Sequence, residues 1–282
     1  MRSHKLEALG LRMPAIEAGP SDTEEAVVFL HGHPGSSRDW EGLIPQVGSF
    51  GRAVAFDLPG LGKADKPDDW GYSIGWYGNV VAAAFHVLGI KRAHLVMHDL
   101  GGGAGLLWAA AHPDAFASAV IMGTGILKDY NWHRLAALQR KTVIGPMLVR
   151  LTNERRFRGT MRSSHRNSRK LPDWFIDRLW EDYDYRSRRA MMQMYRDAPP
   201  SGFERLGPLF RELDRPALVL WGKKDPFVPA EQAYLQRESF PSADVVVLEG
   251  SGHWPFIDNP ERAAEHIVPF LESQLVGAPG AA

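Results

Sequence analysis

Cysteine is absent from this chain of 282 residues, which excludes disulfide bonds and thiolate metal sites. An excess of charge is also lacking, because 33 lysines and arginines balance 33 aspartates and glutamates. These totals give no reason to expect a nucleic acid or a membrane as a partner. No segment has the roughly twenty apolar residues of a transmembrane helix, and residues 1–13 lack the apolar centre of a signal peptide. We expect a cytoplasmic protein, either a monomer or a homodimer.

Short apolar runs bounded by turn residues recur along the chain. Such runs are typical of strands that are covered on both faces. They occupy residues 26–30, 53–56, 94–97, 118–122, 217–221 and 244–248. Helical patterns lie between several of them, as at 74–90 and 260–275. The alternation predicts an α/β fold in which helices cover both faces of a mostly parallel sheet.

The alternation stops between about Lys128 and Gly207, where the pattern is helical and polar. A segment of this length is too long for a plain loop. We expect residues 128–207 to form a helical cap inserted into a core domain, which is built from residues 1–127 and 208–282.

The predicted cap is basic and contains several tryptophans. From Arg134 to Arg196 it has 16 lysines and arginines against 6 aspartates and glutamates. This excess indicates either a solvated lattice of ion pairs or an anionic substrate or partner. Trp132, Trp174 and Trp180 either line an apolar substrate pocket or belong to the packed interior of the cap, and we place Trp132 in the pocket.

Asp99 stands where the buried run 94–97 gives way to a glycine-rich helix start, DLGGGAG. Its side chain is expected at the carboxyl edge of the sheet, where open α/β folds bind their ligands. This is the setting of a nucleophile elbow. One alternative is that Asp99 only caps the helix. A dinucleotide-binding fingerprint does not fit, because Leu106 takes the place of its last glycine.

Two further residues follow later strands and complete a catalytic pattern. Asp225 lies in WGKKDPFVP and His253 in GSGHWPF, so the chain order is nucleophile, acid and histidine. Each has a plain alternative as a turn or loop residue. The three together predict a catalytic triad of Asp99, Asp225 and His253, with Asp129 as a competing candidate for the acid.

The segment HGHPGSS, residues 31–37, supplies a predicted oxyanion hole. It follows the first apolar run, and the backbone N–H groups of His33 and Leu100 are its expected donors. His31 and His33 lack a third ligand at a recognisable spacing. We therefore expect no metal and no cofactor.

These motifs resemble the α/β-hydrolase superfamily. HGHPGSS, FDLPGLGKADKP, LVMHDLGG, WGKKD and GHWPFIDNPE are similar to the branch with an aspartate nucleophile, namely epoxide hydrolases and haloalkane dehalogenases. The likeness covers nearly the whole chain outside the variable cap. Met97 departs from the pattern, since a small residue is usual two positions before the nucleophile.

A carboxylate nucleophile restricts the chemistry. With an ordinary pKa of about 3.9, Asp99 is ionised at neutral pH and needs no base for its own attack. Attack on an ester or amide gives an energetic anhydride, whereas attack on a saturated carbon gives an alkyl ester. Water activated by His253, which Asp225 orients, then hydrolyses that ester, and His33 and Leu100 stabilise the oxyanion.

The leaving group separates the two branches of the family. The dehalogenases place a tryptophan after the nucleophile, but Leu100 offers no side-chain donor. Epoxide hydrolases use cap tyrosines as acids, and MYRDAP resembles the segment that carries one of them, Tyr195. Tyr130 is the expected second acid, with Tyr183 and Tyr185 as competitors.

The resemblance thus implies a cofactor-independent epoxide hydrolase that acts on a small molecule. One alternative is a haloalkane dehalogenase with the same triad. An alternative of another class is a ligand-binding homologue with negligible turnover.

Overall fold

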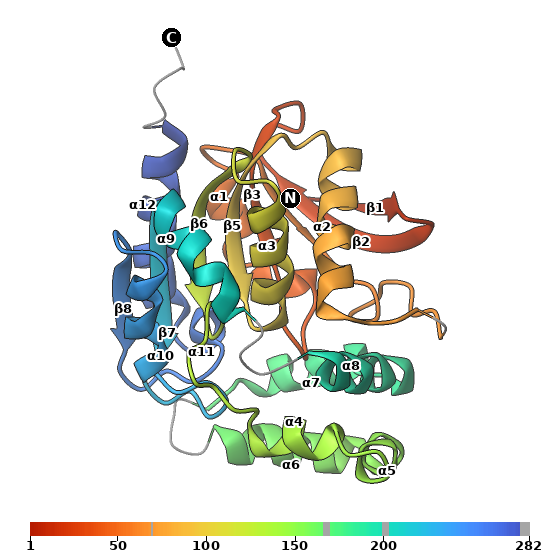
Figure 1. Cartoon of the computed structure of the whole chain (residues 1–282). Coiled ribbons are helices and arrows are strands. Elements are labelled where there is room, and N and C mark those ends of the chain that lie inside the picture. Colours follow the sequence, from red (N-terminus) through yellow and green to blue (C-terminus); the bar gives the residue numbers. More distant parts are fainter. Residues whose placement is uncertain (69, 166–169, 199–202, 277–282) are drawn as a thin grey trace.

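The computed structural model describes residues 1–68, 70–165, 170–198 and 203–276. Its centre is an eight-stranded sheet with the order β1-β2-β4-β3-β5-β6-β7-β8 (Figure 1). The strands are β1 Arg2–Ala8, β2 Leu11–Ala18, β3 Glu25–Leu30, β4 Ala53–Phe56, β5 Arg92–His98, β6 Phe116–Met122, β7 Ala217–Gly222 and β8 Asp244–Leu248.

The sheet is mostly parallel, which confirms the predicted fold class. β3 to β8 pair in parallel, and β1 and β2 form an antiparallel hairpin that joins the sheet edge through β4. Apart from Arg92 at the start of β5, the strands β4, β5 and β6 are buried because helices cover both of their faces. Their carboxyl ends meet at one edge, which is the edge that carries the loops described below.

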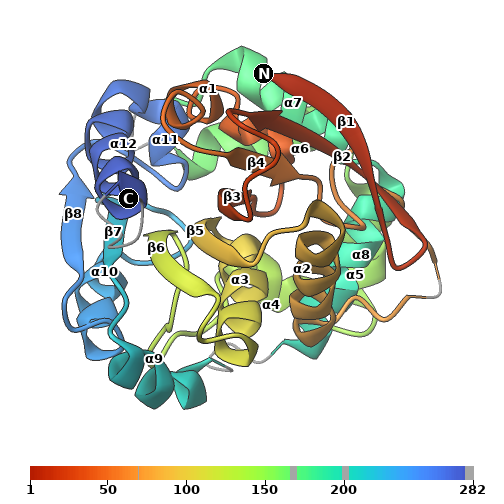
Figure 2. The same ribbon diagram turned by 90° about the horizontal axis from the view of Figure 1, so that it is seen from above.

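Helices pack on both faces of the sheet (Figure 2). One face is covered by α2 Ile74–Leu88, α3 Leu100–Ala111, α9 Gly207–Leu213 and α10 Glu231–Leu235, and the other by α1 Ile44–Val47, α11 Pro255–Asp258 and α12 Pro260–Val276. Two apolar clusters fill the interior. Phe85, Trp108 and Phe210 belong to the first cluster, and Trp40 and Trp254 to the second.

Within the described residues, five α-helices follow β6 and precede α9 in the chain. They are α4 Arg134–Gln139, α5 Ile144–Leu151, α6 Glu154–Ser164, α7 Asp173–Asp182 and α8 Tyr185–Asp197. Figure 1 shows them in two layers below the sheet: α7 and α8 lie nearer to it, and α4, α5 and α6 lie farther out. We keep the division at residues 128 and 207 as a proposal and call these helices the cap.

Ion pairs join the inner layer of the cap to loops of the sheet. Arg178 of α7 forms a buried pair with Asp39, which lies in a short 3₁₀ helix, Ser37–Trp40. Lys63 contacts Asp182 at 3.0 Å. Similar pairs are Arg38–Glu181, Lys66–Asp184 and Arg189–Asp68. Within the described residues, no helix is long and apolar enough to cross a membrane.

Candidate active site

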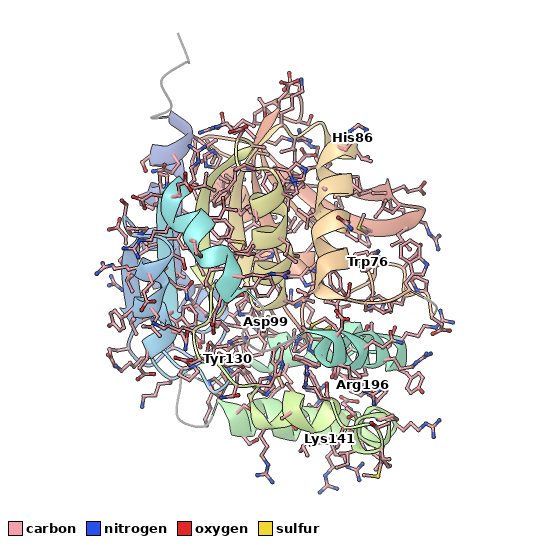
Figure 3. The ribbon with its side chains drawn as sticks, viewed as in Figure 1. Trp76, His86, Asp99, Tyr130, Lys141 and Arg196 are labelled. Atoms are coloured by element: carbon pink, nitrogen blue, oxygen red, sulfur yellow. The ribbon has the colours of Figure 1, made fainter. Side chains whose placement is uncertain are left out.

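Asp99 sits on a sharp turn between β5 and α3. Its φ of 48° and ψ of −118° are unusual for a residue other than glycine, and holding such a conformation costs on the order of 1–3 kcal/mol. The side chain makes no capping hydrogen bond with α3, so the helix-capping alternative is wrong. Figure 3 shows Asp99 where the sheet meets the cap. The turn therefore presents the carboxylate instead of satisfying the helix, as a nucleophile elbow does.

Two glycines make room for this turn. A Cβ on Gly32 would lie 2.5 Å from the Cβ of Asp99, so the loop after β3 can approach the carboxylate only with glycine there. A Cβ on Gly105 would lie 2.6 Å from Sδ of Met97. Gly105 thus accommodates the large side chain that stands two positions before Asp99.

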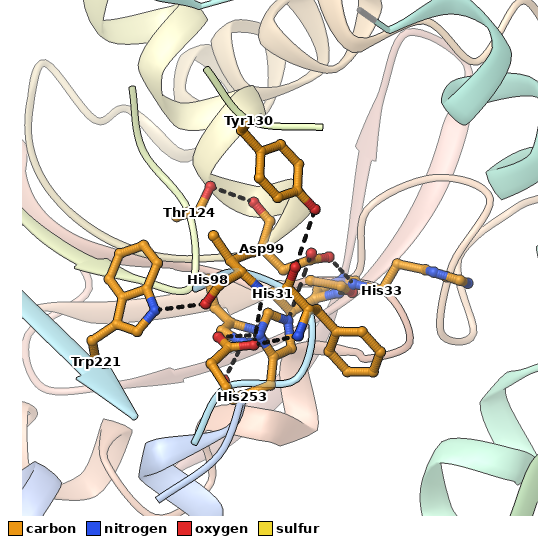
Figure 4. A network of polar contacts seen from close by, with 12 residues as sticks. His31, His33, His98, Asp99, Thr124, Tyr130, Trp221 and His253 are labelled. Carbon is orange, nitrogen blue, oxygen red and sulfur yellow. Dashed lines mark hydrogen bonds and ion pairs between the residues drawn. The ribbon is translucent and has the colours of Figure 1, made fainter. Parts of the chain in front are cut away.

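The three residues of the predicted triad lie together at the carboxyl edge of the sheet, and Figure 4 shows two of them, Asp99 and His253. His253 Nδ1 lies 2.7 Å from Oδ2 of Asp225, and Nε2 lies 3.7 Å from Oδ2 of Asp99. The other Asp225 oxygen accepts hydrogen bonds from the backbone N–H groups of Phe227 and Val228. This fixes the Asp225 carboxylate and, through it, the orientation of the imidazole.

Asp129 does not contact His253. It is exposed in the turn after β6, where its backbone N–H donates to the Glu204 carboxylate at 3.0 Å. The geometry therefore joins the histidine to Asp225, and Asp129 lies outside the cluster.

Asp99 and His253 each stabilise the charged form of the other. Burial opposes protonation of His253, but the Asp225 and Asp99 carboxylates outweigh it and raise its pKa to about 10. Burial likewise opposes ionisation of Asp99, yet the neighbouring imidazolium lowers the pKa of this carboxyl below its ordinary value. In the resting site both groups are therefore charged at neutral pH.

The backbone amides of His33 and Leu100, the predicted oxyanion hole, differ in their contact with Asp99. The N–H of His33 donates to Oδ1 of Asp99 at 2.8 Å. Among the described contacts, no hydrogen bond joins the N–H of Leu100 to this carboxylate. His31 holds the loop after β3, which carries the His33 amide. Its Nδ1 donates to the Gly32 carbonyl and its Nε2 accepts from the N–H of Leu58, each at 2.9 Å. Both His31 nitrogens are thus engaged with the backbone.

A cavity of about 580 Å³ lies between Asp99 and the cap. The triad residues Asp99 and His253 form its floor, and Tyr183, Tyr195 and side chains of α4, α5 and α6 form its walls. A smaller space of about 70 Å³ also reaches Asp99. Asp99, His133, Tyr195 and Phe227 line both spaces. An apolar chamber with a few convergent polar groups is typical of a small-molecule site.

The cap tyrosines occupy different positions. Tyr195 is buried beside Asp99 and lines both spaces, and burial together with the Asp99 charge raises the pKa of its hydroxyl. The hydroxyl of Tyr130 lies 3.3 Å from the carbonyl oxygen of Phe227 and lines only the smaller space. Tyr183 lines the larger cavity beside the His33 ring. Tyr185 is 43% exposed and outside the cavity.

The three cap tryptophans also differ. Trp132 lines the smaller space, but its indole N–H donates to the Ala198 carbonyl at 3.3 Å. Trp180 packs against Phe157 inside the cap, and Trp174 is 59% exposed.

His133 also lines the candidate site, although no sequence motif predicts it. Its Nδ1 accepts from the backbone N–H of Ala136 at the start of α4, so the neutral ring carries its proton on Nε2. Burial lowers the pKa of His133, which favours this neutral form, and the ring lines both spaces at Asp99. The one available signal is its place in YNWH, next to Tyr130 and Trp132.

Comparison with known proteins identifies the family. The family model for the alpha/beta hydrolase fold matches residues 25–260, so the chain belongs to this family. A 2-hydroxy-6-oxononadienedioate/2-hydroxy-6-oxononatrienedioate hydrolase of Burkholderia vietnamiensis is 27% identical over 88% of this chain and 87% of its own. A cis-3-alkyl-4-alkyloxetan-2-one decarboxylase of Xanthomonas campestris pv. campestris is 26% identical over 93% of each chain.

Solved structures show the same fold. The haloalkane dehalogenase DbeA from Bradyrhizobium elkani USDA94 superposes with a TM-score of 0.83 and 24% identity over 98% of this chain and 99% of its own. The epoxide hydrolase CorEH superposes with a TM-score of 0.79 and 19% identity over 95% and 98%. The family and its relatives support a hydrolase that acts on a small molecule.

Proposed function

We propose that the protein opens epoxides to vicinal diols through an alkyl ester on Asp99. The proposal rests on the different surroundings of the two Asp99 carboxylate oxygens. Oδ1 is held by the His33 amide, whereas Oδ2 points to His253 in a side chain that is 26% exposed. An ionised oxygen without a base of its own suits attack on a saturated carbon.

In the first step Oδ2 attacks an epoxide carbon and the ring C–O bond breaks. The leaving oxygen then carries the negative charge, and it needs donors within the cavity. Tyr195 and His133 line the cavity, and their O–H and Nε2–H groups can act as these donors. Tyr195 gives its proton to the alkoxide, and His133 donates a hydrogen bond.

The loss of the Asp99 charge prepares the second step. The ester no longer raises the pKa of His253, so the imidazolium releases its proton, which restores the Tyr195 hydroxyl. Neutral His253 then takes a proton from water while the resulting hydroxide attacks Cγ of Asp99. The His33 amide stabilises the oxyanion, a contribution of about 3–4 kcal/mol per donor in other hydrolases. Collapse releases the diol and leaves Asp99 ionised and His253 protonated.

A halide is the less favoured leaving group. It requires N–H donors around it, and the side chain of Leu100 has none. The indole N–H of Trp132 is engaged with the Ala198 carbonyl. Tyr195 and His133 together suit an oxygen that must gain a proton.

A second candidate rests on the oxetanone decarboxylase, which is similar over 93% of each chain. Asp99 would attack the sp3 carbon that carries the ring oxygen of a β-lactone and free its carboxylate. Loss of CO₂ would then form the alkene and expel Asp99 as a carboxylate. This route needs no water and no base.

A single turnover in H₂¹⁸O with enzyme in excess tests the proposal. For an epoxide such as styrene oxide, we expect ¹⁸O in the peptide that contains Asp99 and a diol that is unlabelled in that turnover. A labelled diol with an unlabelled peptide would exclude the ester. Release of CO₂ from a β-lactone without ¹⁸O in the peptide would favour the second candidate, and halide from haloalkanes without diol from epoxides would favour a dehalogenase.

A further inference from the structure

Helix α5 exposes an apolar stripe. Val143, Ile144, Met147 and Leu151 are exposed to 78, 36, 49 and 51%, respectively. Their spacing places them on one side of the helix, while Gly145 and Val149 are buried on the opposite side. We call the four exposed residues the α5 face. Isolated exposed apolar residues are ordinary, but a contiguous stripe of this kind marks an interaction surface.

The surroundings of the α5 face are positively charged. Residues 130–153 contain no aspartate or glutamate. Lys141 and Arg150 are exposed beside the stripe, and Arg155 and Arg156 follow at the start of α6. In the part of the chain that the structure describes, none of these four has an ion-pair partner, whereas Arg158 and Arg162 of the same helix pair with carboxylates. The free cations thus gather around the apolar stripe.

The same surface carries the mouth of the active-site cavity. Leu151 and Arg156 are exposed and also line the 580 Å³ cavity. Leu135 of α4 does the same, with 36% exposure. Figure 3 shows Lys141 in the outer layer of the cap, on the side away from the sheet. A molecule that leaves an apolar phase at this surface can enter the cavity without crossing water.

We propose that the α5 face docks on the surface of an anionic lipid bilayer. The helix lies in the plane of the interface with Val143 and Met147 among the acyl chains, and Lys141, Arg150 and Arg155 contact lipid phosphates. The net charge of zero predicts no such contact for the chain as a whole. The charge is unevenly distributed, however, and a membrane senses only the charges within about 10 Å of it. The inference does not depend on which reaction Asp99 performs.

Flotation with vesicles tests the proposal on the full chain. We expect the protein to float with vesicles of phosphatidylcholine and phosphatidylglycerol, with a partition on the order of tenfold or more above that on phosphatidylcholine alone. High salt should release it. V143D/M147D and K141E/R150E should each abolish the binding, because one removes the apolar contact and the other the charge contact.

V87D is the matched control. Val87 is 53% exposed near the end of α2, close to His86, which Figure 3 shows at the opposite end of the molecule. This variant should bind vesicles like the parent chain, and circular dichroism checks that all variants are folded. Two results would overturn the proposal: no binding to anionic vesicles, or equal binding by V143D/M147D. In the first case, a dimer in solution that these substitutions dissociate would assign the α5 face to a second copy of the chain.

Discussion

His253 Nε2 lies 3.7 Å from Oδ2 of Asp99, close enough for an ion pair but beyond hydrogen-bond distance. We expect the water of the second step to bind beside this pair, where it can reach both the imidazole and Cγ of the ester. The imidazole is thus placed for the second step and not for the first.

The first prediction follows from this separation. H253Q should still form the alkyl ester, because Asp99 is ionised without help from a base. Hydrolysis of the ester should slow by about 10²-fold or more. Mass spectrometry of the quenched enzyme should find Asp99 with the mass of the epoxide added. D99N is the control and should show no adduct, and free diol production by H253Q at the parent rate would contradict the two-step scheme.

The second prediction concerns the acid of the triad. D225N should lower the rate of ester hydrolysis by about 10²-fold or more, because it removes the hydrogen-bonded charge at His253 Nδ1. D129N should leave the rate unchanged, since Asp129 is exposed and distant from the imidazole. Single-turnover rates of the two variants decide between the residues, and a larger effect of D129N would reverse the assignment.

The third prediction tests the donors to the leaving oxygen. Y195F should lower the rate of epoxide opening by about tenfold or more, and H133A should lower it in the same direction. Both should reduce ester formation in the burst phase and leave ester hydrolysis little changed. Y185F is the matched control because Tyr185 lies outside the cavity. A Y195F variant with full activity would remove this hydroxyl from the mechanism.

The fourth prediction is a pH dependence of stability. The pKa of His253 is raised from 6.5 in the unfolded chain to about 10 in the folded one. Its stabilising contribution is therefore complete below pH 6.5 and is lost as the pH rises toward 10. Between these values the parent chain should lose more stability than D225N, in which the pKa is less raised. Urea unfolding at several pH values measures the difference, and parallel curves would contradict it.

The fifth prediction concerns the attachment of the cap. Arg178 and Asp39 are both buried, with side chains 5% and 0% exposed. R178A leaves Asp39 without its partner and should lower the free energy of unfolding by about 3–5 kcal/mol. R38A is the control, because its ion pair with Glu181 is largely exposed and should contribute about 0–1 kcal/mol. If both variants unfold at the same urea concentration, the buried pair contributes little.

The core of the fold could be predicted from the sequence because the parallel strands are continuous apolar runs. The hairpin β1–β2 could not be predicted in this way, because its first strand is not a continuous apolar run. In Arg2–Ala8 exposed and buried residues partly alternate, so no continuous run marks the strand. Asp99, Asp225 and His253 could be predicted because each follows a strand, and topology alone brings strand ends together.

The cap site was less predictable. Its side chains come from helices whose packing depends on many weak contacts, so sequence position says little about which tyrosine faces Asp99. His133 is the clearest case. The orientation of its ring follows from a hydrogen bond that the backbone N–H of Ala136 donates to Nδ1, and no sequence motif predicts this bond.

The five ion pairs between the sheet loops and helices α7 and α8 have a consequence for substrate traffic. They include the buried pair Arg178–Asp39 and attach the inner layer of the cap to the sheet loops at several separate points, which favours a cap that stays in place while substrate enters. Leu135, Leu151 and Arg156 are exposed and also line the cavity, so we expect molecules to enter beside α5. The side chains at this entrance, more than movement of the cap, should therefore decide which compounds are admitted.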